Sequence, residues 1–251
     1  MLEESLDAFQ TQVEASLERV GALAKRLKKL KSAAQSGDLR EIGKAVGEIR
    51  EVAAAARQQA DALSFEFDDS NYFPDGLLRE VVAEADAKGL KVFAQDGKLY
   101  CYPLLVRVKG AERAVQIGKK TERGIRPSAL VAKLYRMQSK PARFKPGDFL
   151  GLIYRAYQHC AGKNQSPVLT LVEIYDVLTL MPGAAKEYTR DDFARDLYLL
   201  DRSGVTTAND GAEFHFFAST GTRNASSTLV CIAEDGSEKR YYGISFTSLE
   251  R

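Results

Sequence analysis

Twelve cations lie within residues 107–145, and only two acids share that window. The twelve are Arg107, Lys109, Arg113, Lys119, Lys120, Arg123, Arg126, Lys133, Arg136, Lys140, Arg143 and Lys145. Lys and Arg side chains neutralise phosphates and release counterions, which supplies most sequence-independent affinity for nucleic acid. These residues are therefore the candidate nucleic-acid-binding set. DNA is the expected ligand, and RNA fits the same pattern.

The rest of the chain carries no positive excess. Residues 1–65 are neutral, while residues 66–106 and 146–251 each carry a net charge of −4, so the whole chain sums to +2. A local excess of this size concerns partners rather than fold. An acidic protein surface and an ordinary solvated surface remain alternatives for the same cations.

Residues for enzymatic chemistry are scarce. The chain has two histidines, and its three cysteines, Cys101, Cys160 and Cys231, match no zinc or redox motif, so we expect reduced thiols in apolar surroundings. A metal-dependent nuclease would need Glu-x-Lys on the strand that follows Asp96, but residues 116–119 read Gln-Ile-Gly-Lys. We expect no enzyme, no metal and no cofactor, with a nuclease as the weakest alternative.

Two apolar seams at heptad spacing predict an antiparallel helical hairpin over residues 1–65. Gly37 suits the end of the first helix, and Asp38 suits the cap of the second. The seam residues that we expect to contact a partner protein or a second copy are Leu6, Val13, Val20, Leu27, Ile42 and Ile49.

The middle segment, residues 66–146, is expected to be a small basic α+β domain. Its pattern predicts a helix over 75–88, strands over 91–95, 98–109 and 114–118, a loop over 119–126, a helix over 128–138 and a basic linker over 139–147. Asp96-Gly97 predicts a hairpin turn, and Pro103 indicates an edge or a bulge within its strand.

The C-terminal segment, residues 147–251, predicts helices over 149–160, 169–180 and 191–200, the last capped by Thr189. A hairpin should turn at 209–211, and another should pair 228–233 with 241–246. This order resembles a winged-helix domain over 147–248, which implies a DNA reader or a protein-docking module. Because the third helix carries four acids among its arginines, a scaffold or protein-docking role is favoured over DNA reading.

Together these segments predict an α+β chain with helical ends and a basic centre. The layout resembles accessory subunits of SMC-like, chromosome-organising ATPases and of bacterial anti-phage defence complexes. That resemblance implies a non-enzymatic nucleic-acid-binding subunit whose partner, an ATPase, supplies the chemistry. A winged-helix transcriptional regulator is the main alternative. With no long apolar run and no signal-like start, we expect a cytoplasmic location and no membrane contact.

Overall fold

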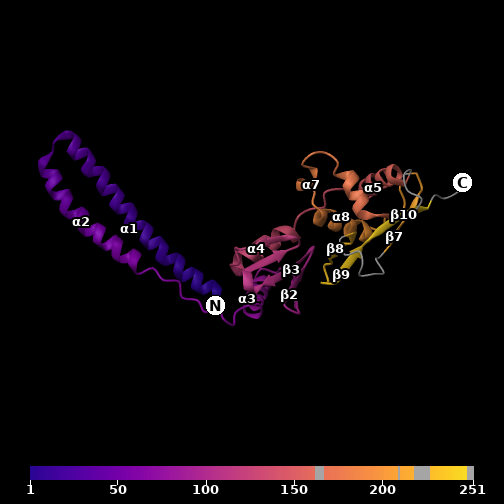
Figure 1. The fold of residues 1–251 in the computed structure, drawn as a ribbon, viewed down its shortest axis with the longest axis horizontal. Coiled ribbons are helices and arrows are strands. Elements are labelled where there is room, and N and C mark those ends of the chain that lie inside the picture. Colours follow the sequence, from indigo (N-terminus) through magenta and orange to yellow (C-terminus); the bar gives the residue numbers. More distant parts are fainter. Residues whose placement is uncertain (162–166, 209, 218–226, 248–251) are drawn as a thin grey trace. The chain divides into compact units, whose positions relative to one another are not determined.

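The computed structural model describes residues 1–161, 167–208, 210–217 and 227–247. It confirms the expected α+β class, with a long N-terminal helical hairpin and antiparallel sheets (Figure 1). The chain forms two compact units, residues 1–72 and residues 73–251, which are described separately below. Most of the expected middle segment and the expected C-terminal segment thus share the second unit.

The first unit is the predicted hairpin of α1 (Leu2–Ser36) and α2 (Leu39–Asp61). Gly37 ends α1 in the left-handed conformation at φ 73°, where a residue without Cβ is favoured. The Asp38 side chain then caps α2 by accepting a hydrogen bond from the Glu41 amide at 3.0 Å. Both end signals read from the sequence are therefore confirmed.

Small side chains and ion pairs join the two helices of the hairpin. Ala33, Ala45 and Ala56 are buried, so the helices approach closely where side chains are short. Ion pairs link Arg26 to Glu48 and Lys29 to Glu41, each at 2.5 Å. Such exposed pairs contribute little to the stability of the fold.

The second unit begins with α3 (Asp75–Ala87) and a five-stranded antiparallel meander, and α4 (Pro127–Gln138) follows. In chain order the strands are β1 (Phe93–Gln95), β2 (Lys98–Cys101), β3 (Leu104–Lys109), β4 (Ala114–Ile117) and β5 (Lys120–Glu122), with a short 3-10 helix, η1 (Gly110–Glu112), between β3 and β4.

Two expectations for this sheet were wrong. The single strand expected over 98–109 is a hairpin that turns at Tyr102-Pro103, because proline cannot donate to a ladder. The loop expected over 119–126 contains β5, which pairs with β4. The turn at Asp96-Gly97 is confirmed, with φ of 49° and 71° at its two residues.

The described residues of the second half of this unit form four helices and two further antiparallel sheets, ordered β6-β10-β7 and β8-β9. Its elements are α5 (Pro146–Ala161), β6 (Leu169–Thr170), α6 (Leu171–Leu178), α7 (Ala184–Glu187), α8 (Arg190–Arg202), β7 (Glu213–Phe217), β8 (Leu229–Ile232), β9 (Glu238–Tyr241) and β10 (Gly243–Thr247). The core packs Phe149 and Ile153 of α5 against Ile174 of α6 and Phe193 and Leu197 of α8.

The expected pairing of residues 228–233 with 241–246 was wrong. Residues 229–232 pair with 238–241, not with 241–246. β10 pairs instead with β6 and β7. Across the expected turn at 209–211, an isolated antiparallel bridge joins Thr207 to Glu213, the first residue of β7. Residue 209 of that turn lies outside the described residues. None of the described helices is long and apolar enough to cross a membrane.

Candidate nucleic-acid interface

One face of the five-stranded sheet is buried, and the opposite face, called the open face below, is exposed at Arg107 and Thr121 although Leu105 and Ala114 on it are buried. Alternate residues Leu99, Val106, Val115 and Ile117 are buried. Glu122, which pairs with Val115 in the register and so shares this face, forms an ion pair with Lys133 of α4. Figure 1 shows α3 and α4 beside the sheet, and both helices contribute further buried residues. Because successive side chains of a strand point to opposite faces, the residues between them lie on the other face.

A row of polar side chains crosses this open face. Register pairs join Lys98 of β2 to Arg107 of β3, Arg107 to Gln116 of β4, and Gln116 to Thr121 of β5. We call these four residues the basic row. Arg107 and Thr121 are exposed, and Lys98 and Gln116 are partly exposed. Four strands thus present two cations and two uncharged polar groups in one line.

Lys98 and Arg107 form a like-charged cross-strand pair. Cβ atoms of directly opposed residues lie about 4.5–5.5 Å apart, where like charges destabilise a sheet. Within the described parts of the chain, neither side chain has an ion pair with a carboxylate. An anion placed between the two cations would remove this repulsion. The arrangement therefore suits a phosphate.

Three predicted binding residues are partly neutralised by nearby acids. Lys109 lies 3.4 Å from Glu112, Lys133 lies 2.5 Å from Glu122, and Lys140 lies 2.7 Å from Asp192. An ion-paired lysine offers less net charge to a ligand than a free one, although all three side chains keep contact with solvent.

Lys119 and Lys120 lie in and after the turn that joins β4 to β5, close to Asp191 of α8. Burial raises the pKa of Asp191, while the charge of Lys119, a hydrogen bond from its backbone N–H, and the charge of Lys120 oppose that rise. These two lysines are exposed, and their positive charges also act on the Asp191 carboxylate. They therefore lie beside an acid of α8 rather than in the basic row.

The remaining predicted residues are dispersed. Arg113 adopts a left-handed conformation between η1 and β4, and Arg126 precedes α4. Arg123 and Lys145 are exposed, and the Arg136 side chain donates to the Ala132 carbonyl of its own helix at 3.3 Å. Of the twelve residues, Arg107 is the one that the register places in the basic row.

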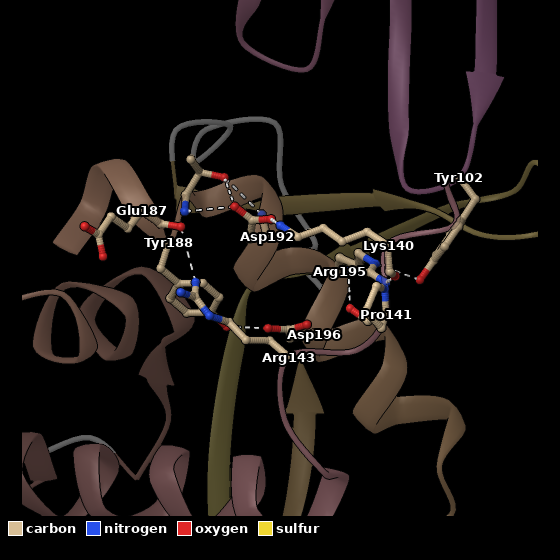
Figure 2. A network of polar contacts seen from close by, with 10 residues as sticks. Tyr102, Lys140, Pro141, Arg143, Glu187, Tyr188, Asp192, Arg195 and Asp196 are labelled. Atoms are coloured by element: carbon tan, nitrogen blue, oxygen red, sulfur yellow. Dashed lines mark hydrogen bonds and ion pairs between the residues drawn. The ribbon is translucent and has the colours of Figure 1, made fainter. Parts of the chain in front are cut away.

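A buried polar network engages the linker after α4 (Figure 2). Arg195 of α8 has 5% of its surface exposed. Its Nε donates to the Tyr102 hydroxyl at 3.1 Å and its Nη1 to the Pro141 carbonyl at 3.3 Å, while Nη2 donates to the Lys140 carbonyl. One guanidinium therefore joins the β2–β3 turn, the linker and α8.

The same network continues along α8. Thr189 and Asp192 form a capping box at its N-terminus, and the Tyr188 hydroxyl donates to Asp196 at 2.8 Å. Burial raises the pKa of Asp196, and that hydrogen bond opposes the rise. Arg143 lies over the Tyr188 ring at 5.1 Å, as Figure 2 shows. Lys140 and Arg143, predicted to bind nucleic acid, thus take part in an internal network.

Burial of α8 limits what that helix can read. Residues 193–198 and Leu200 are all buried, including Arg195, which was a potential base reader by type. A recognition helix must expose the residues that enter the major groove. The acids of its first turn are also engaged, Asp191 beside Lys119 and Asp192 by Lys140.

The residues considered for a nuclease do not come together. Asp96 lies in the β1–β2 turn, and Lys119 lies in the β4–β5 turn. These turns lie at opposite ends of the sheet, because the ends alternate along an antiparallel meander. The described residues contain no group of three or more His, Cys, Asp or Glu side chains that could hold a metal ion.

The predicted partner-binding residues of the hairpin differ in exposure. Val20 and Leu27 are 52% and 47% exposed, whereas the other four, Leu6, Val13, Ile42 and Ile49, are half-buried. Leu17, beside this seam, is exposed as well. The first helix therefore presents apolar side chains that α2 does not cover.

Lys98 is the residue that sequence reasoning missed. It lies outside the basic window, and its pairing with Arg107 depends on the turn at Tyr102-Pro103. Comparison of the chain with protein-family models, curated proteins and solved structures finds no match. The function proposed below therefore rests on the geometry of the chain itself.

Proposed function

We propose that the chain is a non-enzymatic accessory subunit that binds the nucleic-acid backbone through the open face of its five-stranded sheet. The observation that carries this proposal is the Lys98–Arg107 pair, two opposed cations without a carboxylate partner among the described residues. A phosphate between them would turn a repulsive pair into two favourable contacts.

The neighbours of this pair favour binding without strong sequence preference. Gln116 and Thr121 continue the basic row and can hydrogen-bond phosphate or sugar oxygens, which carry no sequence information. Tyr100 has the same strand parity as Lys98 and lies on the same face, partly exposed. Its ring could stack with an unpaired base, which would favour single-stranded segments of DNA or RNA.

The helical ends are proposed to hold other proteins. Val20 and Leu27 on α1 offer apolar contacts at helical spacing. For the C-terminal part we propose a winged-helix-like docking module. Its support is the order α5, β6, α6, α8, β7 and β10 with the sheet order β6-β10-β7. Burial of α8 favours docking over the transcriptional-regulator alternative. Membership of an ATPase-containing bacterial complex, SMC-like or anti-phage, rests on this layout alone.

Fluorescence anisotropy with labelled single-stranded and duplex oligonucleotides over a salt series tests the nucleic-acid role. The double variant Lys98→Ala/Arg107→Ala should bind all sequences more weakly. On duplex DNA its log–log salt slope should fall by about 0.9, the contribution of the one phosphate bound between the two cations. A uniform loss across sequences would indicate backbone contacts rather than base reading.

The matched control is Arg155→Ala/Lys186→Ala, which removes two exposed cations from other helices of the same unit. Its salt slope should stay close to that of the parent. If both double variants lose affinity equally, net charge alone explains binding. If the Lys98/Arg107 variant binds like the parent, the proposed interface is wrong.

A further inference from the structure

The first strand of the meander is an open sheet edge. β1 pairs with β2 alone among the described strands, and all three of its residues are exposed. Sheet edges present backbone N–H and C=O groups that can pair with another strand. Natural proteins often cover such an edge, but no described segment pairs with the outer side of β1.

The backbone geometry identifies which groups of β1 point outward. Gln95 and Lys98 flank a two-residue turn, so they form a hydrogen-bonded pair, and the next pair, Ala94 with Leu99, is a non-hydrogen-bonded one. The N–H and C=O of Ala94 therefore point away from β2. Val92, two residues earlier, has the same parity.

A groove runs beside this edge, between β1 and α3. It has a volume of about 550 Å³, and its apolar lining comes from Leu78, Val82 and Ala83 of α3 and from Ala94 of β1. A strand added to β1 would point alternate side chains into this groove, since its residues must follow the pleat of the sheet. Small or medium apolar side chains fit such a lining.

The surroundings of the groove are acidic in a chain whose net charge is +2. Asp75, Asp86 and Asp96 line it, with one cation, Arg79. A second hollow of about 730 Å³ continues past Asp86 along the residues before β1 and adds Glu234, Asp235 and Lys91. Among the described residues, five acids and two bases thus border the edge, and one of the acids, Glu234, is ion-paired with Arg202 at 2.6 Å. Charge complementarity favours a basic segment there.

We propose that β1 is a strand-addition site for an extended, basic segment of a partner protein, with apolar side chains facing α3 and Lys or Arg side chains toward these acids. Backbone hydrogen bonds to residues 92–94 would provide affinity, and the groove and acids would provide selectivity. The site uses the outer edge of β1, whereas the basic row lies on the open face of the sheet and ends beside β1 at the Gln95–Lys98 pair.

A fluorescein-labelled eight-residue peptide of alternating Lys and Val, acetylated at its N-terminus, is a direct probe. It should bind the full chain and slow hydrogen exchange of the Ala94 amide, measured by NMR. An alternating Glu and Val peptide should not bind. Ala94→Pro removes the outward donor without breaking the β1–β2 ladder, because proline is tolerated at sheet edges, and it should abolish binding.

Asp86→Lys tests the charge independently of any effect of proline on folding. It should weaken binding of the Lys-Val peptide about tenfold, the order of one charged contact. Glu51→Lys on α2 changes the net charge equally at an exposed position outside the groove and should leave binding unchanged. Equal loss in the two charge variants, equal binding of both peptides, or self-association through β1 that excludes the peptide would overturn the proposal.

Discussion

Arg195→Met should destabilise the second unit strongly, because Arg195 joins three separate segments. Its guanidinium is buried and donates to the Tyr102 hydroxyl and to the carbonyls of Lys140 and Pro141. Methionine fills a similar volume but donates nothing. The two carbonyls and the hydroxyl would then lose the partner that compensates their burial.

The expected loss in the free energy of unfolding is about 3–5 kcal/mol. A hydrogen bond to a charged group contributes about 1.5–3 kcal/mol, and disrupting a buried charged network costs about 3–5 kcal/mol rather than the full sum of its bonds. The total stability of a domain is about 5–15 kcal/mol, so this loss is a large fraction of it. Tyr102→Phe removes a single hydrogen bond and should cost about 1 kcal/mol.

Native-state hydrogen exchange followed by mass spectrometry suits this measurement. The chain has no tryptophan, and the helices of the first unit contribute heavily to circular dichroism, so a global signal would mix the two units. Peptides from α8 and residues 139–145 should lose protection in Arg195→Met. Peptides from α1 and α2 should keep theirs.

Arg202→Met is the matched control on the same helix. Arg202 also forms polar contacts, with Glu234 at 2.6 Å and the Tyr198 hydroxyl at 3.0 Å, but its ion pair is exposed. Exposed ion pairs contribute little to stability, so protection should change far less than in Arg195→Met. If the two variants lose equal protection, burial of the guanidinium is not what makes the network stabilising, and the reasoning fails.

Two further predictions concern the thiols and the hairpin. Burial raises the pKa of Cys101 and Cys231 to about 12, so both thiols remain protonated at pH 8. They should react with Ellman's reagent only on unfolding, while half-buried Cys160 reacts first. Rapid reaction that survives Cys160→Ser would contradict this expectation. Val20→Asp should leave the helicity of the hairpin nearly unchanged but reduce co-purification of partner proteins or self-association. Gln58→Asp, at another exposed position of the hairpin, should reduce neither. Equal recovery of partner proteins with both variants would contradict the docking role.

Features encoded by neighbouring residues were predictable from the sequence. Gly37 and Asp38 define the hairpin ends through one conformation and one side-chain cap. Asp96-Gly97 specifies its turn, and Thr189 caps α8 as expected, with Asp192 completing the capping box. Each signal depends on groups within three residues, so no knowledge of the rest of the fold was needed.

Features that depend on distant partners were not predictable. β10 has strong strand character, but its choice of β6 and β7 depends on how α5, α6 and α8 pack. Lys140 donates to Asp192 of α8, and Arg143 donates to the carbonyl of Glu187, which ends α7. Each contact joins residues more than 40 positions apart in the sequence. Local charge density marks such cations as candidates for a ligand and says nothing of their internal partners. The nucleic-acid role of the twelve cations stays a prediction.

The Arg195 network also has a mechanical consequence. Its three acceptors belong to the β2–β3 turn and to the linker, while the guanidinium itself belongs to α8. A force applied to the C-terminal helices would therefore be transmitted to the sheet through these hydrogen bonds. A flexible linker without such bonds would extend under the same force. A protein bound to the C-terminal helices would therefore move together with any ligand bound to the sheet.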